Sequence, residues 1–410
     1  MLVLASLMCW VFLGHISAFS ATPPNTFYVA KNGNDSNTGT LSSPVLTIRH
    51  CVAMMTAGDK CFIRGGTYSE YGAFTYGKPG VPVGTSFSNA ITIAAYPGES
   101  VTWTYGKSDT IFGLGTDSFP THRSFYWIID GISFDGAKVV DFPIGGLYAD
   151  YIRMSNCEVK NGIKSGLLPE GDYWELLNLN VHHNGFDGQD HGLYWAGQHG
   201  LIDGGSYHDN SGSGIQIFNS GSNSVSDNTV RNTKIYGNAP DGFDAGMILS
   251  TGSRNTAYNN LFYNNGPSRE ISLDFRCTDC SLYNNTIVPR PGVTGIIISS
   301  GGTWVTNAVI KNNIIYTTGT PVSDGGTGTV LRSNLTTDPM FTNAAALDFT
   351  LKPGSKAIDA GEDLSSIVST DMTGKPRPVG NAFDIGAFEF GSATAGDSIP
   401  PVVSITVAAP

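Results

Sequence analysis

Between Asp172 and Gly302 the chain repeats one short pattern of polar and apolar positions. Each copy has an asparagine-rich turn, then a glycine or serine, then a brief run in which apolar side chains alternate. The runs are Gly192–Trp195, Gly214–Ile217, Gly246–Leu249, Ser272–Phe275 and Gly295–Ile298, and Lys164–Leu167 looks like an earlier copy whose strand is interrupted by Pro169. The copies start at steps of roughly 22–32 residues, which is typical of repeat architectures.

Alternation with a period of two predicts strands whose side chains point to opposite faces. Strands this short cannot bury an apolar face alone, so neighbouring copies must stack. The first predicted inward ladder is Leu193, Ile215, Met247, Leu273 and Ile296, and the second is Trp195, Ile217, Leu249, Phe275 and Ile298. No long amphipathic helix separates the copies, so the pattern predicts an all-β parallel solenoid. A β-sandwich is the alternative, but it would not place asparagine and glycine at a similar offset from every strand.

Asparagine recurs in the turns that precede these strands. The positions are Asn184, Asn210, Asn260, Asn265, Asn284, Asn285, Asn312 and Asn313. Asparagine tolerates the left-handed conformation that tight corners need. We therefore expect asparagine side chains to stack from coil to coil and to form hydrogen bonds along the axis.

The N-terminus carries an apolar run, Leu2–Leu13, that is too short to cross a bilayer. Small residues at Ala18 and Ser20 follow it, so residues 1–20 are predicted to be a signal peptide and the protein to be secreted. No other stretch is long and apolar enough to span a membrane.

Cysteine usage agrees with an oxidising compartment. Cys9 lies in the predicted signal peptide, so five of the six cysteines remain. The expected disulfides are Cys51–Cys61 and Cys277–Cys280, with Cys157 in the core. Half of a zinc site at Cys277 and Cys280 is the alternative, but no second cysteine or histidine pair accompanies it.

The formal net charge of −11 and the lack of lysine and arginine clusters argue against nucleic acid as a partner. The same balance provides no general field that would attract an anionic polymer. An anionic substrate would therefore need local basic residues or a bound cation.

Several segments resemble known families. Tyr258–Gly266 and Leu282–Ile287 resemble coils of right-handed parallel β-helix proteins, the pectate-lyase-like superfamily. The region from Thr26 to Tyr68, with a predicted short helix from Arg49 to about Ala57, resembles the entry cap of secreted β-helix proteins, including the family 9 polysaccharide lyases. The helix would cover the open end of the solenoid. These resemblances imply a right-handed parallel β-helix with a short N-terminal capping helix.

The C-terminal part resembles the choice-of-anchor Q segment of bacterial secreted β-helix proteins. The resemblance is carried by Asp338–Phe341, Asp348–Leu351, Gly354–Gly361, Asp371–Arg377 and Asp384–Glu389. We therefore expect a single β-helix domain at 21–390, in which 337–390 forms a C-terminal cap. Residues 391–410 are expected to be a linker or the start of a further domain.

Charged residues are scarce, yet many of them fall at outward positions beside the inward ladders. One face is predicted to gather Asp190, Tyr194, Phe218, Asp244, Glu270, Asp274 and Arg276, with Asp187, His191 and Asp241 in the adjoining corners. Carboxylates at this spacing suit an oxygen-liganded cation such as calcium. The alternative is that the aspartates cap turns through Asx hydrogen bonds. The predicted calcium ligands are Asp187, Asp190, Asp241, Asp244 and Glu270.

Three resemblances bear on this face. Asp241–Asp244 resembles part of the calcium-binding aspartate cluster of family 9 lyases, whose lysine base has no match here; Arg276 is the nearest basic residue downstream. Glu270–Arg276 resembles the metal-and-base strand of family 6 alginate and chondroitin lyases, but the second basic partner would fall near Ile297. His191 beside Asp190 is similar to the Asp/His/Tyr set of mannuronan epimerases, without their Asp-Pro-His-Glu phrase.

Together the resemblances imply a calcium-assisted lyase that cleaves a uronate-containing polysaccharide. We expect the protein to be secreted, from its predicted signal peptide, and monomeric. The expected base is Arg276 or Lys164 and the expected acid is Tyr194 or His191, with Asp274 also at the catalytic centre. Trp195, Gln216 and Phe218 are expected to contact sugar. A glycoside hydrolase that uses two aspartates, an epimerase, or a non-catalytic glycan-binding protein are the alternatives.

Overall fold

We describe a computed structural model that covers residues 24–116, 121–219, 225–242, 244–299 and 304–391. The predicted signal peptide and nearly all of the predicted linker lie outside these residues. Among the described residues, no helix is both long and apolar enough to cross a membrane.

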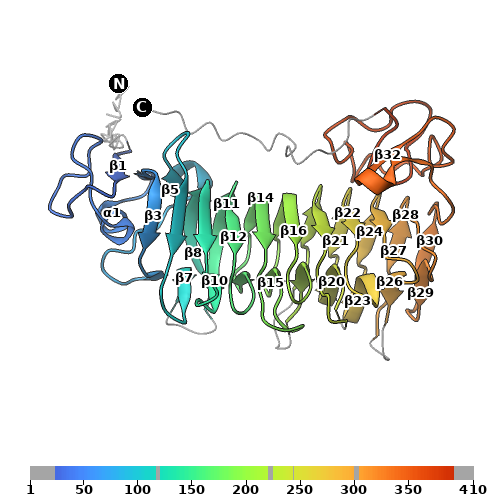
Figure 1. Ribbon diagram of the computed structural model, residues 1–410, viewed down its shortest axis with the longest axis horizontal. Coiled ribbons are helices and arrows are strands. Elements are labelled where there is room, and N and C mark those ends of the chain that lie inside the picture. The colour runs from blue at the N-terminus through green and yellow to red at the C-terminus, as the bar shows by residue number, and fades with distance from the viewer. Residues whose placement is uncertain (1–23, 117–120, 220–224, 243, 300–303, 392–410) are drawn as a thin grey trace, which may run out of the picture.

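The chain winds into coils that stack along one axis, and corresponding strands of successive coils pair in parallel (Figure 1). One sheet, called here the ten-strand sheet, consists of β4 (Gly72–Thr75), β7 (Thr110–Gly115), β10 (Phe142–Leu147), β13 (Leu167–Pro169), β15 (Leu193–Trp195), β17 (Ile215–Ile217), β20 (Met247–Ser253), β23 (Arg269–Thr278), β26 (Thr294–Ile298) and β29 (Val322–Asp324). Its strand order follows the chain, as a solenoid requires.

The remaining strands of the coils form a second, bent sheet of two rows. The first row is β1 (Thr26–Val29), β2 (Lys60–Ile63), β5 (Ile91–Ala95), β8 (Arg123–Asp130), β11 (Ala149–Ser155), β14 (Glu175–His182), β16 (Leu201–His208), β18 (Thr229–Arg231), β21 (Thr256–Tyr258), β24 (Ser281–Tyr283), β27 (Val309–Lys311) and β30 (Val330–Arg332). The second row is β3 (Gly66–Ser69), β6 (Val101–Thr104), β9 (Ile132–Asp135), β12 (Glu158–Lys160), β19 (Lys234–Tyr236), β22 (Leu261–Tyr263), β25 (Thr286–Val288) and β28 (Ile314–Ile315). The long strands β14 and β16 belong to both rows. The architecture is a parallel β-helix, as the repeated pattern predicts.

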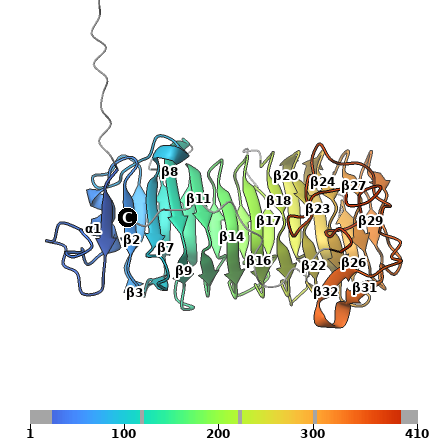
Figure 2. The same ribbon diagram turned by 90° about the horizontal axis from the view of Figure 1, so that it is seen from above.

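Figure 2 shows the coils following one another along the axis. Apolar side chains of successive coils fill the space between the two sheets. Trp103, Trp127, Trp174 and Trp195 have no exposed surface. The inward ladders predicted for Leu193, Ile215 and Met247, and for Trp195, Ile217 and Leu249, are confirmed by strand register and burial. Burial along an axis lets the core grow with each added coil.

The predicted register is wrong at β23. Met247 pairs with Ile271, and Leu249 pairs with Leu273, so the ladder is displaced by two residues from the prediction. Leu273 therefore belongs to the second ladder, while Phe275 lies outside the core with half of its surface exposed, 50%. A shift of two keeps the faces of a strand unchanged, so the alternation alone could not reveal it.

Asparagine side chains link successive coils, as predicted. In one series the side-chain amide of each residue donates to the side-chain oxygen of the next, through Asn184, Asn210, Asn238 and Asn265 at 2.9–3.0 Å. We call this series the asparagine column. The last amide, from Asn265, donates to Oε2 of Glu270 at 2.5 Å. A second series runs through Asn260, Asn285, Asn313 and Asn334.

Both ends of the stack are covered. Helix α1 (Ile48–Met54) is slightly shorter than the predicted helix and buries Ile48, Cys51 and Val52 against the first coils. At the other end β31 (Phe341–Asn343) and β32 (Asp348–Leu351) form a small antiparallel pair. Phe349 packs with Tyr263 on the outside of the second sheet, so the C-terminal segment lies on the side away from the ten-strand sheet (Figure 1).

The cysteine prediction is confirmed. Cys51 and Cys61 form one disulfide and Cys277 and Cys280 form another, while Cys157 is free and buried. The first bond ties α1 to β2. The second closes the corner that follows the outward Phe275.

Candidate functional site

The outer surface of the ten-strand sheet carries the candidate site. Register aligns one outward row, which consists of Leu168, Tyr194, Gln216, Ile248, Ser272 and Ile297. Two positions further along each strand lies a second row, which includes Glu170, Ala196, Phe218, Ser250 and Asp274. Successive members of a row are one strand spacing apart, about 4.8 Å. Polar groups from β13 to β23 are therefore brought to one surface.

His191 lies in the corner before β15 and is almost completely buried, with 3% of its surface exposed. Its Nδ1 accepts a hydrogen bond from the backbone N–H of Ser213 at 3.0 Å, so this nitrogen carries no proton. Burial lowers the pKa of His191 to about 4, against an opposing hydrogen bond with Gln216. His191 is thus neutral near pH 7, and its proton resides on Nε2. The ring of Tyr194 stacks on the imidazole at 5.7 Å.

Asp244 lies on the next-but-one coil, with its Oδ2 3.5 Å from Nδ1 of His191. Its side chain is 14% exposed, and Oδ2 has no hydrogen-bond partner. Burial raises the pKa of Asp244 to about 6, although the positive charge of Arg269 acts in the opposite direction. The carboxylate is therefore mostly ionised at neutral pH while one oxygen is unsatisfied. An unsatisfied buried acceptor is costly, and a cation or a substrate proton could satisfy it.

Glu270 is not part of this surface, and its prediction as a metal ligand is wrong. The displaced register puts Glu270 at the small-residue position that Gly246 occupies one coil earlier. Its side chain has no exposed surface, and its two oxygens accept hydrogen bonds from the backbone and side-chain nitrogens of Asn265. Burial raises the pKa of Glu270 to about 7. Its role is to end the asparagine column.

The other predicted calcium ligands do not converge either. Oδ2 of Asp190 accepts hydrogen bonds from the backbone of Phe186 and Asp187, and Oδ1 of Asp187 accepts one from Gln189. These are the Asx caps that the alternative interpretation predicts. Asp241 is exposed in its turn. Within the described part of the chain, the one group of three candidate ligands with mutually close atoms is His122, Asp150 and Asp172, which contains none of the five.

The predicted sugar contacts fall into two groups. Trp195 is completely buried in the core, so its prediction as a sugar-stacking residue is wrong. Gln216 and Phe218 are half-buried on the outer surface, where Phe218 contacts Tyr194 at 6.2 Å between ring centroids. The inward position of Trp195 follows from its place in the second ladder.

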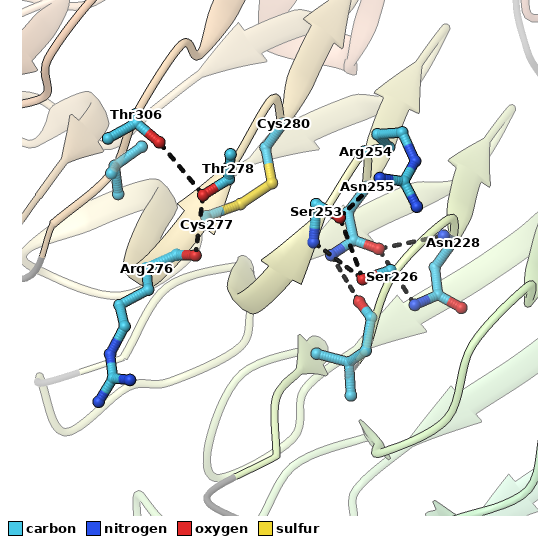
Figure 3. Close-up of a disulfide and its surroundings, with 12 residues drawn as sticks. Ser226, Asn228, Ser253, Arg254, Asn255, Arg276, Cys277, Thr278, Cys280 and Thr306 are labelled. Atoms are coloured by element: carbon cyan, nitrogen blue, oxygen red, sulfur yellow. Dashed lines mark hydrogen bonds between the residues drawn. A yellow bond between two sulfur atoms is a disulfide. The ribbon is translucent and has the colours of Figure 1, made fainter. Parts of the chain in front are cut away.

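The remaining predicted catalytic residues lie apart from His191. Lys164 is exposed and pairs with Asp141 at 3.2 Å. Asp274 is buried and accepts a hydrogen bond from Ser272 Oγ at 2.7 Å. Arg276 is exposed on the corner after it, and Figure 3 shows its side chain extending away from the Cys277–Cys280 disulfide.

Three residues of this surface were not among the predicted site residues. Glu170 is half-buried in the second outward row, and burial raises its pKa. Arg269 influences Asp244 through its charge. Phe275 contacts Phe218 at 5.6 Å. Nothing in the alternating pattern of the sequence indicated that Phe275 turns outward.

Comparisons with known proteins agree with this architecture. Residues 165–336 match the family described as a right handed beta helix region. The solved structure of pectate lyase Pel9A aligns with a TM-score of 0.59, covering 90% of this chain and 97% of that one at 15% identity. The chain is a right-handed parallel β-helix. At that identity the alignment establishes only the fold of this β-helix.

Sequence relatives carry a common name. Pectate lyase L of Dickeya dadantii is 25% identical over 236 residues, which is 56% of the β-helix chain and 43% of that protein. Pectate lyase PEL9 of Emericella nidulans is 34% identical over 92 residues, 22% of the chain and 20% of that protein. The chain thus spans less than half the length of these relatives. The family match contains every strand from β15 to β30, and hence His191, Tyr194 and Asp244.

Proposed function

We propose that this β-helix is a polysaccharide lyase that cleaves a uronate-containing polymer by β-elimination on the outer surface of the ten-strand sheet. The observation that carries the proposal is the Asp244 carboxylate, which has an unsatisfied oxygen beside the neutral His191. The ring of Tyr194 stacks on that histidine. The relatives named pectate lyases support it at the level of a polysaccharide-active enzyme.

β-Elimination requires a base, an acid and positive charge near the uronate carboxylate. The base takes the C5 proton, a C4–C5 double bond forms, the C4–O bond breaks, and the leaving oxygen receives a proton. Asp244 is our candidate base, because its pKa of about 6 leaves it ionised yet basic at neutral pH. His191 is a positioning residue, since the backbone of Ser213 donates to its Nδ1 and Gln216 forms a hydrogen bond with its side chain.

Tyr194 is our candidate acid. Burial, followed by the nearby Glu170 charge, raises the pKa of Tyr194, so its hydroxyl keeps its proton at neutral pH. The ring is held between His191 and Phe218. The Arg269 guanidinium supplies positive charge close to Asp244.

Calcium remains a prediction. A bound calcium ion would neutralise the substrate carboxylate and make the adjacent proton more acidic. Asp244 is the one predicted ligand with a buried unsatisfied oxygen among the described residues. Calcium normally takes six to eight oxygen ligands, and the other four predicted ligands do not join Asp244, so we assign no step to the ion.

The test is the ultraviolet absorbance of unsaturated uronate, measured on pectate, alginate, ulvan and glycosaminoglycans with calcium and with EDTA. We expect one acidic polymer to give an increase that Asp244→Asn abolishes. Asp363→Asn is the matched control, because Asp363 caps an exposed turn of the C-terminal segment, away from the ten-strand sheet. Absence of the increase on every polymer, with wild-type protein that is folded, would contradict the proposal.

One observation favours a hydrolase as the second candidate. Glu170 and Asp244 are both carboxyls of this surface whose pKa values burial raises, and glycoside hydrolysis uses a pair of carboxyl groups. A hydrolase would produce reducing ends without the ultraviolet increase. Secretion is also a proposal, and the two disulfides support it because such bonds persist in oxidising compartments.

A further inference from the structure

A β-bulge interrupts the ten-strand sheet beside the candidate site. β20 and β23 pair at Ser250–Asp274 and resume at Gly252–Cys277, so a single residue of β20 faces both Phe275 and Arg276. Phe275 has φ +42° and Arg276 has φ +67°. Positive φ is uncommon for bulky residues, and bulges of this kind change the direction in which a side chain points. The backbone thus adopts a costly conformation that turns Phe275 out of the core.

Phe275 extends an aromatic surface across neighbouring coils. Its ring lies 5.6 Å from that of Phe218, which lies 6.2 Å from that of Tyr194. Phe275 is 50% exposed, although other apolar residues of the strand point inward. An exposed phenylalanine beside Phe218 offers an apolar face to a sugar ring.

Arg276 adds a positive charge directly beside this ring. Its side chain is exposed, and its guanidinium forms no ion pair or hydrogen bond with any described residue. A guanidinium keeps its proton in proteins, so it is unsuited to act as a base. It is well suited to bind a carboxylate through two parallel hydrogen bonds.

The corner after Arg276 is covalently closed. Cys277 and Cys280 are bonded and have no exposed surface, and Thr278 Oγ1 donates to the Arg276 carbonyl (Figure 3). Strained backbone persists where the surrounding structure holds it. Here sheet pairing holds the backbone on both sides of the bulge, and the disulfide closes the corner on its C-terminal side.

We propose that Phe275 and Arg276 form a subsite for one acidic sugar unit, in which the ring packs on the apolar face of the sugar and the guanidinium binds its carboxylate. This subsite rests on the proposed function and gives it a preference for free acid over esterified polymer. Arg276 is then a specificity-determining residue rather than the base.

The test uses the full-length protein and the polymer that it cleaves, as the free acid and as the methyl ester. We expect Arg276→Gln to raise KM and Kd for the free acid on the order of tenfold and to leave the ester unchanged. Phe275→Ala should weaken both forms about fivefold, since stacking does not depend on charge. Arg276→Lys and Phe275→Tyr should restore most of the affinity.

Matched controls are Arg332→Gln, on exposed β30, and Phe390→Ala, in the C-terminal segment away from the ten-strand sheet. Both should bind as the wild type does, and circular dichroism should show all variants folded. If the wild type cleaves an acidic polymer while Arg276→Gln and Phe275→Ala keep its affinity and its acid-to-ester ratio, the subsite is overturned and the proposed function stands. Equal losses in Phe275→Tyr and Phe275→Ala also overturn the subsite. A wild type that neither cleaves nor binds acidic polymers overturns both.

Discussion

Glu270 couples the folding of this protein to pH through a single buried carboxyl. Its pKa in the folded chain is about 7, above the ordinary 4.5 of a glutamate. Between these values the folded chain holds a proton that the unfolded chain has released, so stability falls as pH rises across this window. Across this window the free energy of unfolding falls by on the order of 3 kcal/mol.

We therefore expect urea unfolding to give a lower free energy of unfolding at pH 8 than at pH 5. Glu270→Gln should remove most of this dependence, because glutamine does not ionise. Asp187→Asn, at an exposed loop, should leave the dependence unchanged. Equal pH dependence in the wild type and Glu270→Gln would contradict the assignment.

Asp244 makes a different prediction, for catalysis. Only the ionised carboxylate can accept a proton, so kcat/KM on the acidic polymer should rise with pH through about 6 and then level off. Burial raises the pKa of Asp244, and the positive charge of Arg269 lowers it. Arg269→Gln removes that charge, so the rise in kcat/KM should move to higher pH. A profile that stays flat from pH 5 to 8 would exclude Asp244 as the base.

The sequence predicted the positions of some individual site residues and not of others. Asp244 and Tyr194 were expected on one face, with His191 in the adjoining corner. They lie together because the aligned strands stack corresponding corners of successive coils. Glu270 was misplaced because it occupies a position that the aligned copies fill with glycine. The sequence pattern shows only that position 270 is polar. Whether Glu270 accepts hydrogen bonds from the asparagine column or binds a metal depends on its neighbours in the folded structure.

At the scale of elements, the bulge in β23 and its disulfide act as one unit. Replacing Cys277 and Cys280 by serine should cost on the order of 2 kcal/mol, because the bond closes only a short loop. The larger effect should be on binding, since the corner that orients Arg276 would loosen. We expect a higher Kd for the free-acid polymer.

The matched control replaces Cys51 and Cys61 by serine. Their disulfide joins α1 to β2, far from β23 in the stack (Figure 1). It should lose stability without a change in Kd. If both double variants bind the free-acid polymer with the same Kd, the Cys277–Cys280 disulfide does not support the subsite.

The elements themselves were predictable where the repeat is regular. Alternation specified the strands β15, β17 and β20, and recurrent asparagine specified the corner hydrogen bonds. The bulge was not predictable, because nothing in the alternation of Ser272–Phe275 marks an extra residue. Its signature is a positive φ at two successive positions, which is a property of the folded sheet.

At the scale of the whole molecule, the C-terminal segment is anchored by buried charge. Arg377 and Glu389 pair at 2.7 Å with no exposed surface, and Arg377 also bonds to Asn259 of a coil. Removing one partner leaves the other charge buried and unpaired, at a cost of about 3–5 kcal/mol. Arg377→Ala should therefore release the segment from the stack.

We expect limited proteolysis to cut Arg377→Ala within residues 337–391 before the wild type. Cleavage of the polymer should persist, because this segment packs on the sheet opposite the candidate site. Arg332→Gln, an exposed arginine, should show wild-type resistance. Loss of activity in a variant whose coils remain folded would show that the two regions are coupled.

The asparagine column also gives the stack an electrical direction. Every amide in it donates toward the C-terminal end, so the small dipoles of Asn184, Asn210, Asn238 and Asn265 point the same way and add. The positive end of such an array favours an anion, as a helix N-terminus does. Glu270 stands at that end. An inserted coil would therefore have to carry an asparagine in the same orientation, and a coil without one would divide the array and leave buried donors facing no acceptor.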